Sequence, residues 1–108
     1  MPKFETIQEV IQSLQRNFKT DAAAGVTAVY QLNYSGDDGG HWHLHVDNQQ
    51  LEVKEGVYDD PDVTVTCKSE DWLKIANGEA NPMMMMMKGK LKIRGSIPLA
   101  TKLQSIFF

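Results

Sequence analysis

Three histidines occupy alternate positions in one segment of the chain, His41, His43 and His45. In an extended strand, residues two apart point to the same face, roughly 7 Å from one another. Two neutral imidazoles at that spacing can share a zinc ion. The intervening residues, which include Trp42 and Leu44, are apolar, so we expect the histidines to face solvent on the side away from the core. A metal site built from histidines or methionines is the alternative.

The single cysteine lacks the surroundings of a nucleophile. Cys67 shares the alternation of Val63 and Val65, so we expect it to be buried as a small hydrophobic side chain. A catalytic thiol would need a lowered pKa and a neighbouring base. No glycine-rich phosphate loop, nucleophile elbow or zinc-protease helix occurs in the sequence. We therefore expect a protein that is not an enzyme, with no catalytic residues and no cofactor.

The most unusual segment is a run of five methionines. On a helix, Met83, Met86 and Met87 share one face, whereas Met84 and Met85 point elsewhere. Methionines can fill a core, and their flexible thioether chains also suit a surface or cavity that accepts varied apolar shapes. Thioethers are in addition good ligands for copper(I). The sequence leaves these three uses open.

A basic segment follows the methionines directly. It contains Lys88, Lys90, Lys92 and Arg94, in a chain whose net charge is −3. Lysines on an edge strand commonly protect it from aggregation. The alternative is attraction to anionic lipid head groups, worth on the order of 1 kcal/mol per residue near a membrane surface. Transient contact with a membrane is therefore one expectation from this segment.

Length and composition fit one soluble globular domain. The chain has 108 residues, 42% of them hydrophobic and 23% charged, and we expect a single domain over residues 1–108. The acidic balance argues against binding to nucleic acid, which needs a basic surface. No apolar run is long enough to cross a bilayer, and the N-terminal segment lacks the apolar centre of a secretory signal. We therefore expect a cytoplasmic protein.

The spacing of apolar residues separates helices from strands. Ile7, Val10 and Leu14 recur at helical spacing, and Thr6 with Glu9 forms a capping box at the start of that helix. Alternation of apolar and polar residues predicts strands over residues 26–34, 41–46, 51–54, 63–67 and 90–94. Further helices are predicted to start at Ser69, at Asn81-Pro82 and at Ser96. This order predicts an α+β fold, with one largely antiparallel five-stranded sheet covered on one face by helices.

Residues 62–104 resemble the sterol carrier protein 2 domain family. In that family an acidic strand-to-helix passage is followed by Asn/Asp-Pro, a short helix, G-[KR]-L-K-x-x-G and a closing helix with L-x-x-K-L. The matching positions are Asp62, residues 69–72, Gly78, Pro82, Gly89, Leu91, Lys92, Gly95, Leu99, Lys102 and Leu103. Residues 28–30 and Trp42 are also similar to the family, so the resemblance spans nearly the whole chain.

The resemblance implies an apolar tunnel that binds and transfers sterols, fatty acids, fatty acyl-CoA or phospholipids without transforming them. The implied lipid-binding residues lie on the sheet and on three helices: Leu32, Trp42, Leu44, Trp72, Ile75, Met83, Met86, Met87, Leu99, Leu103, Ile106 and Phe107. The alternative is an accessory or structural module of lipid or quinone biosynthesis that binds a partner protein.

The sequence departs from the family at three places. Thr101 stands where some members have a glutamine that faces the ligand, and the chain ends in SIFF rather than in a peroxisomal signal of the S-K-L type. The methionines replace residues that are often polar or aromatic in relatives, which affects the shape of the implied tunnel. We expect the two final phenylalanines, Phe107 and Phe108, to plug the cavity or to contact a membrane.

Overall fold

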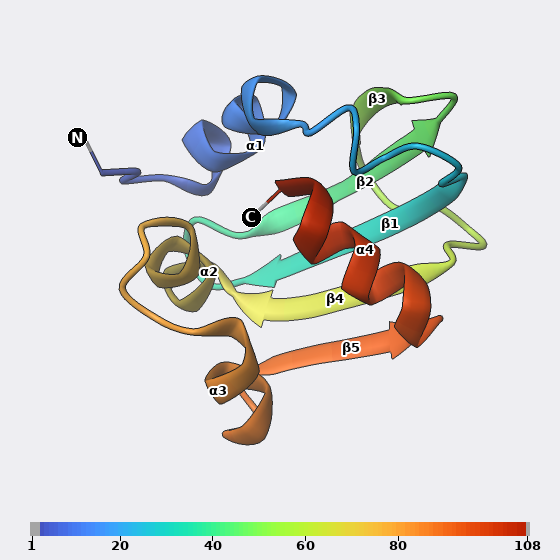
Figure 1. Cartoon of the computed structure of the whole chain (residues 1–108). Coiled ribbons are helices and arrows are strands. Elements are labelled where there is room, and N and C mark those ends of the chain that lie inside the picture. The colour runs from blue at the N-terminus through green and yellow to red at the C-terminus, as the bar shows by residue number, and fades with distance from the viewer. Residues whose placement is uncertain (1–2, 108) are drawn as a thin grey trace.

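In residues 3–107, which the computed structural model describes, helices and strands follow the order predicted from the sequence (Figure 1). The elements are α1 (Ile7–Asn17), β1 (Ala28–Ser35), β2 (Gly40–Asp47), β3 (Gln50–Glu55), β4 (Val63–Lys68), α2 (Ser69–Ala76), α3 (Pro82–Met87), β5 (Leu91–Gly95) and α4 (Ile97–Phe107). Phe108, which was expected to plug a cavity, lies outside the described residues.

The five strands form one sheet in the order β3-β2-β1-β4-β5. The first three strands form the predicted antiparallel meander. β4 then returns across the sheet and pairs with β1 in parallel, with Leu32 beside Val65, while β5 adds antiparallel to β4. The sheet is therefore mixed, although most of its pairings are antiparallel. Alternation within a strand does not specify its partner, so the sequence did not predict the parallel pair.

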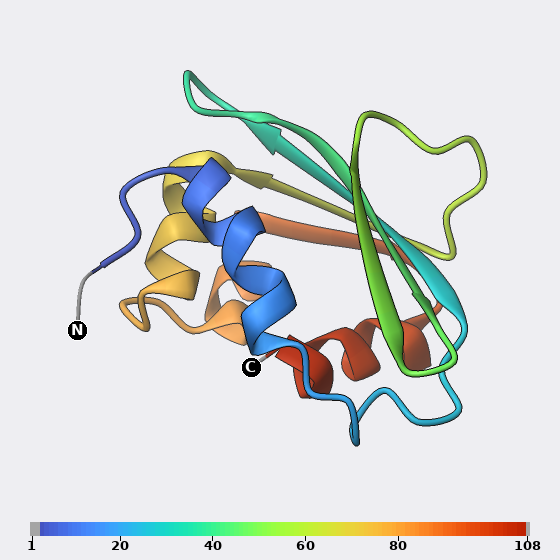
Figure 2. The same cartoon turned by 90° about the horizontal axis from the view of Figure 1, so that it is seen from above.

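The helices lie on one side of the sheet, as Figure 2 shows in the view from above. The side chains that alternate toward them, such as Tyr30, Leu32, Leu44 and Val65, are almost completely buried. This is the arrangement that period-two alternation requires, because one face of each strand has to leave water. In Figure 1, α4 crosses in front of β1 and β4 and reaches β5, whereas α1 lies at the top of the view, on the β2 side of the sheet.

Three of the four predicted helix starts have a side-chain cap, including Ser96 before α4, whose hydroxyl accepts a hydrogen bond from the Leu99 N–H over 3.4 Å. The Glu9 N–H donates to the Thr6 side chain over 3.2 Å at the start of α1, and Asn81 accepts hydrogen bonds from the Met83 and Met84 N–H groups at the start of α3. The prediction for Ser69 was wrong. Ser69 is the first residue of α2, Lys68 precedes it, and this helix has no side-chain cap.

The opposite face of the sheet is more polar, as predicted, but it is not uniformly exposed. The prediction that the three histidines face solvent was wrong for His43, which is buried because the segment that carries Tyr58 covers it. The ring of Tyr58 lies 5.5 Å from that of His43, and Nδ1 of His43 lies 2.6 Å from Nε2 of His45. Gln31 is also buried, and its amide oxygen accepts a hydrogen bond from the Tyr58 N–H over 2.8 Å. The segment after β3 therefore covers part of this face, which strand alternation alone does not reveal.

We predict that Gly95→Ala destabilises the protein much more than Gly89→Ala. Both glycines have positive φ, for which an alanine costs about 1–2 kcal/mol. A Cβ atom on Gly95 would lie 2.2 Å from the Asp62 carbonyl oxygen, whereas one on Gly89 would meet nothing within 4 Å. Urea unfolding should show that Gly95→Ala loses at least about 2 kcal/mol more than Gly89→Ala. Equal losses would contradict this contact.

Candidate functional site

Two apolar hollows lie between the sheet and the helices, each with a volume of about 80 Å³. The first hollow is bordered by α1, β1, β2, α2 and α4, and its lining includes Val10, Leu14, Leu32, Tyr34, Leu44, Trp72, Leu103 and Phe107. The second hollow is bordered by β4, β5, α3 and α4, and its lining includes Val65, Trp72, Met83, Met86, Leu91, Ile93 and Leu103. Both are lined mainly by carbon and sulfur atoms of side chains.

Trp72 and Leu103 line both hollows, so they form a partition between them. Trp72 is carried by α2 and Leu103 by α4, and both side chains are buried. Pockets that hold a ligand usually measure roughly 300–1,000 Å³, so neither hollow has room for a long-chain lipid by itself. The structure contains two hollows instead of the one tunnel that the resemblance implies, and a tunnel requires the Trp72–Leu103 partition to move.

The first hollow is bordered by aromatic side chains from near the two ends of the chain, Phe4 and Phe107. The Asn77 side chain accepts a hydrogen bond from the Phe4 N–H and donates one to the Phe4 carbonyl, which fixes Phe4 in this position. The ring of Phe107 lies 5.9 Å from that of Phe18. Phe107 is buried and lines the hollow.

The structure brings most of the predicted wall residues to a hollow. Those that line one or both are Leu32, Leu44, Trp72, Met83, Met86, Leu103 and Phe107. Trp42, Ile75 and Ile106 are buried in the surrounding core instead, and Leu99 is half-buried. Met87 is 79% exposed and points away from the protein.

The prediction for the faces of the methionine helix was wrong. Met85, expected to point elsewhere, is the residue that packs inward, with 7% of its surface exposed. Met83 and Met86 border the second hollow but remain 69% and 45% exposed, so they form its rim. The direction of this six-residue helix is set by its Asn81 cap and by the immediate return of the chain into β5. The spacing of the methionines in the sequence therefore does not specify which side of the helix faces the protein.

Tyr34 is one of the residues of the first hollow that sequence reasoning missed. Its hydroxyl is fully buried, and it has no hydrogen-bond partner among the described residues. By contrast, the Tyr30 hydroxyl donates to the Leu99 carbonyl over 2.8 Å. Burial, with the adjacent Cys67 thiol as a smaller cause, raises the pKa of Tyr34 well above 10, so this hydroxyl stays protonated. The sequence could have indicated this residue, because the alternation of the strand places Tyr34 on its inward-facing side.

The described linings of the two hollows are uncharged. None of the described residues that line the two hollows is an Asp, Glu, Lys, Arg or His. Burial, followed by the nearby Asp71 carboxylate, raises the pKa of the Cys67 thiol to about 11, so this thiol is protonated at neutral pH. Within residues 3–107, no group of three or more His, Cys, Asp or Glu side chains is placed to hold a metal ion.

Comparison with known proteins gives consistent matches. The model of the SCP-2 sterol transfer family matches residues 7–108. Hydroxysteroid dehydrogenase-like protein 2 of Rattus norvegicus is 35% identical over 106 residues, which are 97% of this chain and 20% of the relative. The chain therefore spans about a fifth of that relative.

Two solved structures show the same fold. The palmitated SCP2L2 of Aedes aegypti, solved by NMR in solution, is 32% identical, with a TM-score of 0.73, and the match covers 94% of this chain and 91% of the mosquito protein. A double mutant of the sec-alkyl sulfatase PisA1 has a TM-score of 0.81 at 20% identity, and the match covers 95% of this chain and 16% of the sulfatase. The sulfatase likeness is one of fold alone.

We predict that Leu103→Ala lowers the free energy of unfolding by about 2–4 kcal/mol, because the partition loses a buried side chain between two existing hollows. Met87→Ala should change it by less than about 0.5 kcal/mol, since Met87 is 79% exposed. Thermal and urea unfolding of the two variants test this pair. A loss for Leu103→Ala as small as that for Met87→Ala would show that Leu103 does not hold the partition.

Proposed function

This chain belongs to the SCP-2 sterol transfer family, and we propose that it is a non-enzymatic module that binds an apolar lipid between its sheet and its helices. The observation that carries the proposal is the pair of apolar hollows whose linings share Trp72 and Leu103. The palmitated mosquito relative, 32% identical over nearly the same length, supports an acyl chain as one suitable ligand. Fatty acids, fatty acyl-CoA, sterols and phospholipids are the candidate classes.

The free energy gained by burying such a ligand is large enough to displace a side chain of the Trp72–Leu103 partition. Burying about a dozen methylenes at about 0.8 kcal/mol each gives roughly 10 kcal/mol before the costs of association. A part of this energy displaces Trp72 or Leu103 and joins the two hollows. We therefore propose that the acyl chain runs from the first hollow to the second beneath α4.

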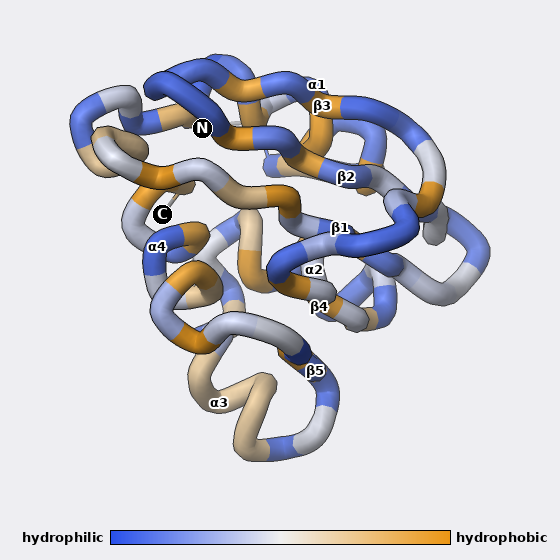
Figure 3. The backbone as a smooth tube through the Cα atoms, turned by 90° about the vertical axis from the view of Figure 1, so that its right-hand side faces the viewer, coloured by the Kyte–Doolittle hydropathy of each residue, from blue (hydrophilic) through white to orange (hydrophobic). Residues whose placement is uncertain are grey.

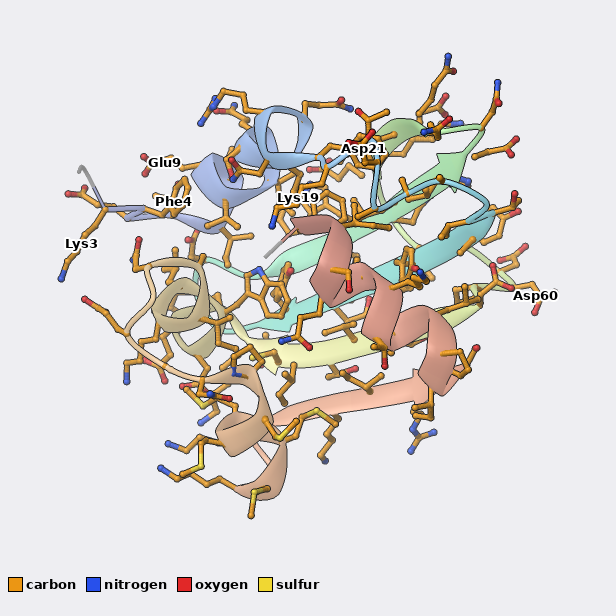
Figure 4. The ribbon with its side chains drawn as sticks, in the orientation of Figure 1. Lys3, Phe4, Glu9, Lys19, Asp21 and Asp60 are labelled. Carbon is orange, nitrogen blue, oxygen red and sulfur yellow. The ribbon has the colours of Figure 1, made fainter. Side chains whose placement is uncertain are left out.

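The methionine helix provides a route for the lipid. Met83, Met84, Met86 and Met87 are 45–79% exposed, and we call these four side chains the methionine surface. Figure 3 shows α3 projecting as an apolar segment beside β5, and Figure 4 shows sulfur atoms gathered around it. Because Met83 and Met86 also border the second hollow, a lipid that enters there passes between them.

Charge next to the methionine surface favours an anionic membrane as the donor or acceptor of lipid. The basic segment, Lys88, Lys90, Lys92 and Arg94, is exposed and adjoins α3. Such residues contribute about 1 kcal/mol each at an anionic surface, and methionines insert easily among acyl chains. None of the described helices is long and apolar enough to cross a membrane, so we propose that contact is peripheral and transient.

A second candidate is an accessory module that serves a partner protein or a neighbouring domain. The observation in its favour is that the match covers only 20% of the rat dehydrogenase-like relative, where the equivalent segment is joined to a much longer chain. Extraction and mass identification of lipid from the purified protein, with titration of a fluorescent fatty acid, separates the two functions. No bound and no bindable lipid would favour the accessory module.

We predict that Met86→Asp weakens palmitate binding about five- to tenfold, because it places a carboxylate at the rim of the second hollow. Met84→Asp is the matched control. Met84 is similarly exposed, at 50% against 45%, but does not line that hollow, so its affinity should stay within about twofold of the wild type. Fluorescence titration measures both, and equal effects would contradict entry of the lipid into this hollow.

We further predict that the double variant Lys90→Glu/Lys92→Glu slows lipid transfer to vesicles containing phosphatidylserine by about tenfold or more. Arg16→Glu on α1 reverses one charge instead of two, away from the basic segment, and should have little effect. With vesicles of phosphatidylcholine alone, the double variant should resemble the wild type. Equal slowing by a single Arg16→Glu exchange, or slowing that persists on neutral vesicles, would refute docking through the basic segment.

A further inference from the structure

Tyr34 lines the first hollow, and its buried hydroxyl has no hydrogen-bond partner among the described residues. The Tyr34 ring lies between those of Trp42 and Trp72, with centroid distances of 5.9 and 5.4 Å. These neighbours fix the position of the ring, so its hydroxyl cannot swing to another partner. A buried hydroxyl without a partner costs about 1–3 kcal/mol, and natural proteins rarely keep such a group without a reason.

The surroundings of this hydroxyl define the group that would satisfy it. The described lining of both hollows carries no positively charged side chain, so an ionised carboxylate or phosphate would be buried there without a counter-charge, at a high cost. Of the other polar side chains in these linings, Asn17 and Gln104 are exposed, and the buried Ser13 hydroxyl already donates to the Val10 carbonyl over 2.6 Å. The remaining donor therefore suits an uncharged oxygen acceptor.

We propose that the Tyr34 hydroxyl donates a hydrogen bond to a neutral hydroxyl or carbonyl oxygen of the bound lipid. The polar end of the ligand then lies in the first hollow, and its apolar body passes the Trp72–Leu103 partition into the second. The preferred class is a long apolar molecule with one uncharged oxygen, such as a long-chain alcohol. This inference depends on the proposed lipid binding and adds the chemistry of the head group to it.

The ionisation of the ligand should accordingly control affinity. A fatty acid enters as the neutral acid, because its carboxylate finds no cation at Tyr34. The affinity for palmitate should therefore fall as the pH rises from about 5 to 8, through and above the ordinary range of a carboxyl pKa, whereas the affinity for hexadecan-1-ol should not change. Tyr34 itself stays protonated over this range, because burial raises its pKa well above 10.

The decisive variant is Tyr34→Phe, which removes only the hydroxyl. We expect its affinity for hexadecan-1-ol to fall about three- to tenfold, while its affinity for hexadecane, which has no oxygen, equals that of the wild type. Its thermal stability should be equal or higher, because an unpaired polar group leaves the core. Tyr58→Phe on the opposite face of the sheet is the control and should bind both ligands like the wild type.

Each outcome of these titrations has a defined meaning. Equal binding of hexadecan-1-ol by Tyr34→Phe and the wild type overturns the role of Tyr34 but leaves lipid binding intact. A wild type that binds palmitate more tightly than hexadecan-1-ol at pH 8 overturns the preference for an uncharged oxygen. Failure of the wild type to bind hexadecane, hexadecan-1-ol and palmitate alike overturns the proposed function, and the inference with it.

Discussion

The apolar face of the five-stranded sheet has to be covered, and the rest of the structure depends on how the helices do this. The alternation of apolar and polar residues along the strands places Leu32, Leu44 and Val65 on that face. The cover is incomplete on both sides of Trp72 and Leu103, where two hollows of about 80 Å³ remain. Hollows of this size cost at most about 2 kcal/mol each, a loss of stability that binding of a lipid would offset.

The two layers of the molecule differ in how easily they can move. The sheet is a continuous hydrogen-bonded ladder, and its far face is tied down by Gln31, which donates to the Gly56 carbonyl and accepts from the Tyr58 N–H. The methionine helix, in contrast, buries only Met85 among its six residues. Segments with little buried surface open at low free-energy cost. Opening of the space between the layers is therefore expected on the α3 side, where the second hollow lies.

The sequence was sufficient to predict features that local physics controls. The period of apolar residues predicted the order of elements and the burial of Cys67, and the same alternation brought Leu32 and Leu44 to the first hollow. Non-local features escaped prediction. Parallel pairing of β1 with β4 depends on where a long connection returns, and burial of His43 depends on the distant Tyr58. The inward turn of Met85 depends on how the chain enters and leaves α3, and the missing partner of Tyr34 is visible only with the surrounding side chains in place.

The most direct test of the central idea is a crystal or NMR structure of the protein with a saturating long-chain lipid. We predict that the chain of the lipid occupies both hollows and passes between Trp72 and Leu103, with at least one of these side chains displaced from its present position. A lipid found only on the outer surface, with Trp72 and Leu103 still in contact with both hollows as they are here, would contradict binding between the sheet and the helices.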